Sequence, residues 1–360
     1  MQVKIIGGGI VGSYLGKKLG EIDKVETESW EKNEELQRKT CGGLISKTGL
    51  NSLDLPYQEA ILNSVKGCKV KADDEELTVE REETQAHVLD MKKLKKKLRE
   101  EAKKEGVKIK KGRKWKSRER AKRKDKEEFL VGADGAISSV AREKSKLNEF
   151  YYTYQVITET EINPDYTEIY MGEYTPDFFA WRIPLSENKA KIGIGTRNRN
   201  LEKALEQFIK KENIKINESE IKRTGSAPIP IFNPDKEIIG NKWALVGDAA
   251  GQVKATTGGG VVMGCKSAEN LAKAIKKGEP GLYTSKQREI NKDLKTHLKI
   301  RKFLNRTDKE KLIKKIKRYN IDRLIEEHGD MDHPGKLKKE ILKRPRFWPM
   351  GIKYFFKNFK

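Results

Sequence analysis

Long apolar runs are missing from this 360-residue sequence, and their absence excludes a chain that crosses a bilayer. Cysteine is scarce as well: Cys41, Cys68 and Cys265 are an odd number in a long chain, which excludes the disulfide framework of small secreted proteins. No signal peptide is visible, so we expect a cytoplasmic protein that touches a membrane surface at most. We assign no metal-binding residues.

The formal net charge of +23 is the largest anomaly of the composition. A positive surface attracts anionic partners, namely nucleic acid, phospholipid headgroups or an acidic protein, and charge alone does not choose among them. The excess of positive charge is greatest in residues 108–126, which contain twelve Lys and Arg and two acidic residues. We expect that segment to be an exposed hairpin or loop, and a solvated lysine-rich surface without a specific partner stays open as an alternative.

The N-terminus has the pattern of a βαβ unit with a glycine-rich turn. Val3 to Ile6 form a predicted strand, Leu15 and Leu19 mark a helical face, and a second strand is expected from Val25. The turn between them reads G-x-G-x-x-G, in which glycines allow the tight turn, the approach of a pyrophosphate and the packing of helix on strand. The residues predicted to contact a dinucleotide there are Gly7, Gly9, Val11 and Gly12.

An acidic residue near the end of the second strand is expected to bind the ribose hydroxyls of the dinucleotide, about 20 residues beyond the turn. Glu28 and Glu31 both lie near that distance. We prefer Glu28, and a surface carboxylate is the alternative for each. Arg38, a few residues further on, is also assigned to the cofactor site.

Two later constellations resemble the first in their local pattern of strand, glycine turn and helix. A carboxylate at a strand end can accept a hydroxyl, and a glycine-rich helix N-terminus can donate amides to a phosphate or a ring carbonyl. The predicted cofactor-binding residues of these turns are Asp134 and Gly135, then Gly247 and Asp248, then Gly258, Gly259 and Gly260. Three such turns in order are far more specific than one.

Between these turns the pattern changes. Residues 86–106 have the spacing of an amphipathic helix, with Leu94, Leu98 and Ala102 on one face, and a strand is expected at residues 107–109. Residues 150–196 contain alternating, aromatic-rich segments, which favour an antiparallel sheet. Because strand, glycine turn and helix recur from Trp243, the dinucleotide-binding domain is predicted to be discontinuous.

At this point the sequence resembles the geranylgeranyl reductase family, which includes digeranylgeranylglycerophospholipid reductases, within the FAD-dependent oxidoreductases of the para-hydroxybenzoate hydroxylase fold. The three glycine motifs are shared with the wider group. Two further motifs narrow the resemblance to the reductases: Cys41-Gly42-Gly43-Leu44 is similar to their C-x-G-G element, and residues 179–184 are similar to their Y-x-W-x-F-P element. Departures occur at Met91, Leu185 and Ala255, where the family commonly has Arg, Lys and Pro.

The resemblance, which covers residues 1–280, implies an α/β plus α+β fold with a Rossmann-like FAD-binding domain at residues 1–149 and 225–284. Residues 150–224 would form an antiparallel substrate domain. In one interpretation residues 44–85 join the sheet of that domain. Residues 285–360 would form a basic helical region. The implied function is FAD-dependent saturation of geranylgeranyl double bonds in archaeal ether lipids or their precursors. The implied catalytic residues are Cys41, Gly42 and Trp181, with Cys41 and Gly42 also at the cofactor, and Phe179, Trp181 and Pro184 would bind the isoprenoid chain.

Several features leave alternatives open. No second G-x-G-x-x-G is visible, so either NAD(P)H or reduced ferredoxin is the expected electron donor. Residues 336–360 carry nine Lys and Arg among six aromatics, a pattern typical of peripheral membrane contact, although aromatics that cap the core would explain it equally well. A flavin monooxygenase or oxidase would share the glycine motifs. A nucleic-acid-binding protein would leave them unexplained, so we expect no nucleic-acid partner.

Overall fold

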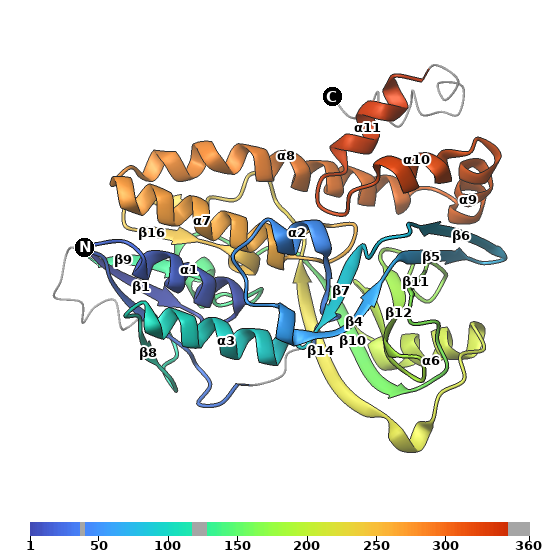
Figure 1. Ribbon diagram of the computed structural model, residues 1–360, viewed down its shortest axis with the longest axis horizontal. Helices are drawn as coiled ribbons and strands as arrows, with labels where there is room; N and C mark the ends of the chain where they lie inside the picture. Colours follow the sequence, from blue (N-terminus) through green and yellow to red (C-terminus); the bar gives the residue numbers. More distant parts are fainter. Residues whose placement is uncertain (37–39, 117–127, 345–360) are drawn as a thin grey trace.

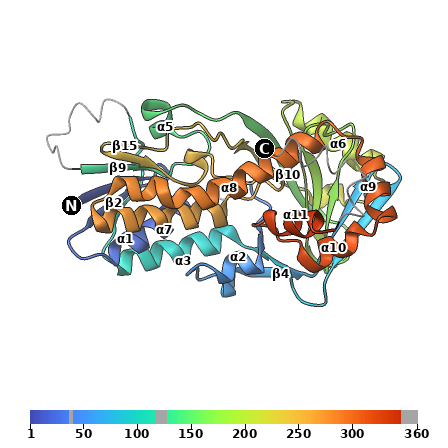
Figure 2. The same cartoon turned by 90° about the horizontal axis from the view of Figure 1, so that it is seen from above.

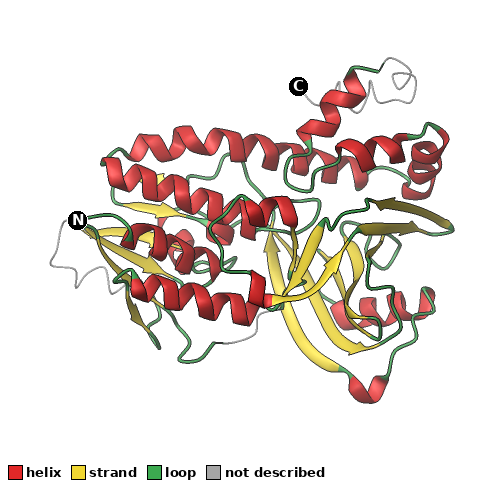
Figure 3. Cartoon of the chain, in the orientation of Figure 1, coloured by secondary structure: helices red, strands yellow, loops and turns green. Residues whose placement is uncertain are grey.

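The computed structural model describes residues 1–36, 40–116 and 128–344, and all that follows refers to these ranges. Within them the strands form sheets of six, seven and three strands, and helices cover the first two (Figures 1 and 3). The predicted α/β plus α+β fold class is confirmed. Arg38, residues 117–126 of the basic segment and the six C-terminal aromatics lie outside the described residues.

The six-stranded sheet has a parallel core to which only the edge strand β15 pairs antiparallel. Val3 and Ile5 of β1 are fully buried and face the helices, because alternate residues of a strand point to one side. The strands, in sheet order, are β15 (Ile239–Gly240), β16 (Trp243–Leu245), β9 (Glu128–Gly132), β1 (Gln2–Ile6), β2 (Glu26–Trp30) and β8 (Lys108–Lys110).

One face of this sheet is covered by α1, α3 and α7, and α8 lies along α7 (Figure 2). Leu15, Leu94 and Leu271 are fully buried in the core that these helices share with the sheet. The short helix α5 packs on the opposite face. The helices are α1 (Ile10–Gly20), α3 (Met91–Lys104), α5 (Ser139–Lys144), α7 (Val261–Lys277) and α8 (Pro280–Leu304).

Two sequence expectations in this region are corrected. The helix expected over residues 86–106 begins only at Met91, because Asp90 accepts hydrogen bonds from the amides of Lys92 and Lys93 and caps it. The preceding residues form strand β7 (Ala86–Leu89) instead. Within the basic segment, Trp115 is only 4% exposed and packs on Trp30, so that part of it contributes to the core.

The seven-stranded sheet is antiparallel except for one parallel pairing, between β11 and β5. Helix α6 (Leu201–Lys211) packs on one face, against Ile192 and Ile194. A three-stranded sheet, β3 (Leu44–Ser46), β7 and β4 (Ile61–Val65), adjoins the other face. The seven strands are β14 (Lys222–Pro230), β10 (Phe150–Glu159), β13 (Lys189–Thr196), β12 (Phe179–Ser186), β11 (Tyr166–Tyr170), β5 (Gly67–Ala72) and β6 (Glu75–Glu80).

The C-terminal helices join the two sheets. In Figures 1 and 2, α8 runs from the helical layer of the first sheet toward the second, and three shorter helices follow it. Lys254 and Asp332 form a buried ion pair of 2.6 Å, and Asp332 also accepts a hydrogen bond from Ser46, the N-cap of the five-residue helix α2 (Lys47–Asn51). The short helices are α9 (Lys309–Arg318), α10 (Ile321–His328) and α11 (Gly335–Leu342).

His297 of α8 makes the docking of this region sensitive to pH. Its Nδ1 lies 2.7 Å from Thr256 Oγ1, and the side chain is 2% exposed. Burial, followed by the charge of Lys254, lowers the pKa of His297 to about 4, against smaller opposing effects of Asp332 and Asp293. The folded protein therefore keeps this imidazole neutral at pH values where the unfolded chain protonates it.

We expect stability to be lost as the pH falls from about 6.5 toward about 4, because only the unfolded chain then takes up the proton on His297. In His297→Gln this loss should disappear. Between pH 7 and pH 4.5 the difference in free energy of unfolding between wild type and variant should change by roughly 2–3 kcal/mol. Urea titrations of both proteins at the two pH values measure it, and a pH-independent difference would refute the assignment.

Candidate functional site

The first two glycine turns meet in space. A Cβ atom built on Gly7 would lie 2.3 Å from the carbonyl oxygen of Ala133 and 2.7 Å from the Cα atom of Asp134. Gly7 has φ = +112°, a conformation that L side chains rarely adopt, so both the backbone and the space require glycine here. A Cβ on Gly12 would meet the Gly7 carbonyl and the Ala133 side chain. The turn after β1 therefore packs directly on the turn after β9.

The third glycine turn lies against the same helix start. A Cβ on Gly247 would be 3.1 Å from a methyl group of Val11, and one on Gly264 of α7 would be 2.7 Å from the same methyl group. A Cβ on Gly260 would lie 2.8 Å from Oδ1 of Asp248. Three segments separated by more than a hundred residues are thus joined by direct contacts around the N-termini of α1 and α7.

Neither of these two helix N-termini has a side-chain cap. Gly9 caps α1 and Gly260 caps α7, neither supplies a capping hydrogen bond, and neither helix has an acidic residue in its first turn. A Cβ built on Gly9 meets nothing within 4 Å. Open space at an uncapped helix N-terminus suits a phosphate, because the first amides and the helix dipole both attract an anion. These residues fit a dinucleotide.

The two candidate ribose carboxylates have different surroundings. Glu31 follows β2 directly and pairs with Arg99 of α3, which also donates to the Gly8 carbonyl oxygen at 2.7 and 2.9 Å. Glu28 pairs with Lys110 at 2.6 Å, away from the glycine turn. Burial works to raise the pKa of Glu28, but hydrogen bonds from Lys110 and Trp30 outweigh it and lower the pKa. The geometry favours Glu31 over the preferred Glu28.

Asp134 is engaged within its own turn. Its carboxylate accepts hydrogen bonds from Ser138 Oγ at 2.5 Å and from the Ser139 amide at 2.6 Å, at the start of α5. Burial raises the pKa of Asp134, although these hydrogen bonds oppose the effect. The carboxylate therefore orders the turn that includes Gly135. Asp248, in the short 3-10 helix Gly247–Ala250, is half-buried beside Gly260 and faces the N-terminus of α7.

The segment Cys41–Gly43 lies on the seven-stranded sheet. A Cβ on Gly42 would lie 2.8 Å from the Ile183 side chain, and the Gly42 carbonyl accepts a 2.6 Å hydrogen bond from Lys191 Nζ. Cys41 is exposed, whereas burial raises the pKa of the Cys68 thiol to about 12 and that of Cys265 still further. Cys41 is thus the most exposed of the three cysteines, Cys68 is partly buried and Cys265 is buried.

The side chains of the aromatic motif, residues 179–184 on β12, are packed inside the protein. Phe179 and Trp181 are each 7% exposed, and Pro184 is buried on the same strand, β12. Trp181 Nε1 donates to Gln155 Oε1 at 3.1 Å, which satisfies the polar atom of the indole. Phe179 and Trp181 therefore lie together in an aromatic cluster on the sheet face that carries the cysteine segment, whereas Pro184 points to the opposite face of the sheet, where its partner Ala190 packs.

Sequence reasoning missed Phe178 and Arg301, which connect this cluster to the last glycine turn. Phe178 stacks on Tyr151 and Phe179, and a Cβ on Gly258 would lie 3.4 Å from its ring. Arg301 of α8, 2% exposed, donates to the carbonyl oxygens of Phe178, Ala255 and Thr256 and lies over the Phe178 ring. The double Phe in the sequence was a usable signal, but a single arginine in a basic helix was not.

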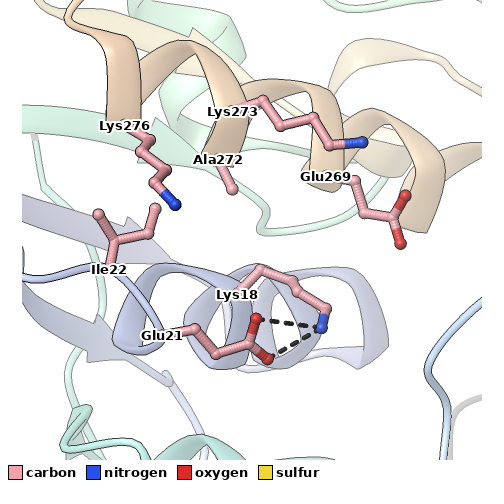
Figure 4. A pocket seen from close by; sticks show the side chains of 7 residues that line it. All are labelled: Lys18, Glu21, Ile22, Glu269, Ala272, Lys273 and Lys276. Carbon is pink, nitrogen blue, oxygen red and sulfur yellow. Dashed lines mark hydrogen bonds and ion pairs between the residues drawn. The ribbon is translucent and has the colours of Figure 1, made fainter.

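A hollow between α1 and α7, lined by Lys18, Glu21 and Lys273 among others, lies at the C-terminal end of α1, far from Gly9 (Figure 4). Among its charged side chains, Lys18 and Glu21 form an ion pair, and Glu269 accepts a hydrogen bond from Tyr14. Among the described residues no group of His, Cys, Asp and Glu is arranged to hold a metal ion.

Comparison with known proteins agrees with this geometry. Residues 149–227 match the family described as the geranylgeranyl reductase catalytic domain. A digeranylgeranylglycerophospholipid reductase of Methanothrix thermoacetophila is 26% identical over 389 residues, covering 96% of this chain and 97% of the relative. The solved structure of a geranylgeranyl bacteriochlorophyll reductase-like protein from Thermoplasma acidophilum has a TM-score of 0.77 at 21% identity, covering 99% and 98% of the two chains.

A flavin-dependent brominase shares the fold as well, with a TM-score of 0.67 at 17% identity over 95% of this chain and 99% of that one. At such identities the solved structures establish the fold alone. The catalytic-domain match and the reductase relative confirm the resemblance that the motifs indicate. The chain is similar to proteins of the geranylgeranyl reductase family along nearly its whole length, and its residues 149–227 match the catalytic-domain model of that family.

Proposed function

We propose that this protein is an FAD-dependent reductase that saturates the geranylgeranyl double bonds of archaeal-type ether lipids or their precursors. The observation that carries the proposal is the continuous contact from the glycine turns, through Gly258 and Phe178, to the aromatic cluster that supports Cys41. A dinucleotide on the turns would have its ring end at this junction. The fold and the relatives support the same reaction class.

Gly9, Gly12 and the N-terminus of α7 would hold the pyrophosphate and the flavin, and Glu31 the ribose. The bound flavin supplies the hydride. An isolated alkene is not polarised, so a proton must reach the other carbon of the double bond. Cys41 is the exposed thiol of the junction and is proposed to deliver that proton or to orient the group that does.

The isoprenoid chain offers only apolar surface and double bonds, so its binding needs an apolar, aromatic wall. Phe179 and Trp181 are proposed to provide that wall, and Pro184, on the opposite face of the same strand, is not part of it. Because these side chains are packed in the structure, substrate entry requires that the aromatic cluster open. Phe178 belongs to the wall by its contacts with Phe179 and Gly258.

The electron donor is proposed to be NAD(P)H or reduced ferredoxin. The described part of the chain presents strongly basic helices, α9 with Lys309, Lys311, Lys314, Lys315, Lys317 and Arg318 among them. A basic surface accelerates association with an acidic electron carrier, and it also attracts anionic headgroups. We therefore also propose a cytoplasmic enzyme with peripheral membrane contact through the C-terminal region. No helix among the described residues has the length and apolarity to span a bilayer.

A monooxygenase or halogenase is the second candidate, since a flavin-dependent brominase shares the fold. Such enzymes need oxygen to react with the reduced cofactor, whereas a reductase transfers hydride to carbon. The cysteine segment on its buried support is the feature that favours the reductase. Oxygen consumption by the chemically reduced protein distinguishes the two.

Gly9→Ala tests the cofactor site without disturbing the fold. Because the added methyl group meets no protein atom, we expect the free energy of unfolding to change by less than about 1 kcal/mol. The methyl group should, however, displace the pyrophosphate and weaken FAD binding about tenfold or more. Gly281→Ala, whose methyl group also meets nothing, is the matched control on α8 and should bind FAD normally. Fluorescence titration with FAD measures both.

The reaction is tested by incubating the reduced, FAD-loaded protein with unsaturated archaeal ether phospholipid under argon. We expect added pairs of hydrogen atoms in the mass spectrum of the lipid. Cys41→Ala should slow the addition about 100-fold or more, because removal of a positioned proton donor typically costs 10²–10⁴-fold, while FAD stays bound. Lipid of unchanged mass, together with rapid oxygen consumption in air, would instead identify an oxidase or monooxygenase.

A further inference from the structure

The cysteine loop, Cys41–Gly43, is held by two side chains of the sheet beneath it. Lys191 Nζ donates to the Gly42 carbonyl oxygen at 2.6 Å, and Gln155 Nε2 lies 3.4 Å from the Cys41 carbonyl oxygen. The Gln155 amide is itself oriented by the 3.1 Å hydrogen bond from Trp181. Both supporting side chains are buried, with 7% and 1% exposure.

Strand register makes this support rigid. Ile183 pairs with Lys191, and Trp181 and Gln155 both pair with Gly193, so the side chains form two adjacent rows on one face of the sheet. Gly193 leaves the space that the Trp181 ring fills, since a Cβ there would lie 2.4 Å from the indole. Movement of the loop would therefore break contacts to three neighbouring strands.

The direction of the two carbonyls fixes the direction of the two following amides. In a trans peptide the C=O and N–H groups point to opposite sides. With the Cys41 and Gly42 carbonyls drawn toward the sheet, the N–H groups of Gly42 and Gly43 point away from it. Among the described residues neither amide donates a hydrogen bond, although Gly43 is buried. A buried amide without a protein acceptor pairs with an ordered water or with a ligand, so this amide is free to donate to a bound group.

Of the two supports, Lys191 is the stronger. Its hydrogen bond is short and charge-assisted, and such bonds contribute about twice as much as neutral ones. The Gln155 contact, at 3.4 Å, is at the weak end of the distance range. Loss of the Lys191 ammonium would also leave the Gly42 carbonyl without its donor.

We propose that Lys191 is a positioning residue that, with help from Gln155, aims the Gly42 and Gly43 amides and the Cys41 thiol at the flavin. This inference rests on the proposed function, because the flavin ring is the acceptor that the two amides would meet. Lys191 itself contacts the loop from the sheet, on the side opposite to the one that the flavin would occupy. Its role is to fix the loop and not to touch the reacting atoms.

The test compares Lys191→Met, Lys191→Arg and the control Lys189→Met, two residues away on the same strand, in the full chain. In FAD-free protein, hydrogen exchange at the Gly42 and Gly43 amides should be at least threefold faster in Lys191→Met. In FAD-loaded protein, this variant should bind FAD about tenfold more weakly and show a shifted visible flavin spectrum. Lys191→Arg should restore most of the affinity and spectrum, and Lys189→Met should match wild type.

Wild-type exchange and FAD affinity in Lys191→Met would overturn the proposal, as would equal effects in the Lys189→Met control. If Lys191→Met does not fold, Gln155→Leu is measured in the same way, with an expected effect of about threefold on both readouts. The exchange measurement needs neither flavin nor lipid. It therefore decides the role of Lys191 even if the wild-type protein fails to reduce geranylgeranyl lipid, which would end the proposed function alone.

Discussion

Buried cations that hold backbone carbonyls from behind are the interaction on which the candidate site depends. Arg99 binds the Gly8 carbonyl, Lys191 that of Gly42, Lys236 that of Ala249, and Arg301 those of Ala255 and Thr256. Burial of a charge is costly, and it lowers the pKa of Lys236 to about 8 and that of Arg301 to about 10. Hydrogen bonds to carbonyl oxygens, with an acidic partner for Arg99, offset that cost.

This arrangement has a common consequence for each turn. A carbonyl that is drawn into the protein leaves the amide of the same peptide unit pointing outward, so the turns present donors and the interior presents positive charge. Both features suit a ligand that carries phosphates and ring carbonyls. The glycines make the close approach of backbone to ligand feasible, while the cations keep those flexible turns in one conformation. Preorganisation of glycine-rich segments therefore comes from side chains that lie elsewhere in the sequence.

The glycine turns are local in the sequence, whereas the cations that support them are distant, and this difference explains how much of the site the sequence predicts. The glycine turns could be found because their chemistry is local: Gly7, Asp134 and Gly247 each follow a strand within a few residues. Spacing alone leaves both Glu28 and Glu31 open, because it does not show where β2 ends or which carboxylate Arg99 reaches. The supporting cations cannot be recognised from their neighbours in the sequence. Of the 360 residues, 77 are Lys or Arg, and nearly all of them have the sequence context of a solvated surface charge. Only the folded chain separates Lys191 from Lys189.

The C-terminal helices also contain buried charges whose role only the folded chain shows. From the sequence, residues 285–360 are predicted to form a basic helical region. In the structure, Arg301 joins the last glycine turn to the aromatic cluster, and Asp332 pairs with Lys254 inside the protein. Each of these contacts fixes a backbone segment on which the flavin would rest. A partner or membrane that shifted α8 would therefore move the loop before Gly258 and the Phe178 backbone together. The helices that would meet an anionic partner and the site that would hold the flavin are therefore connected through the buried guanidinium of Arg301.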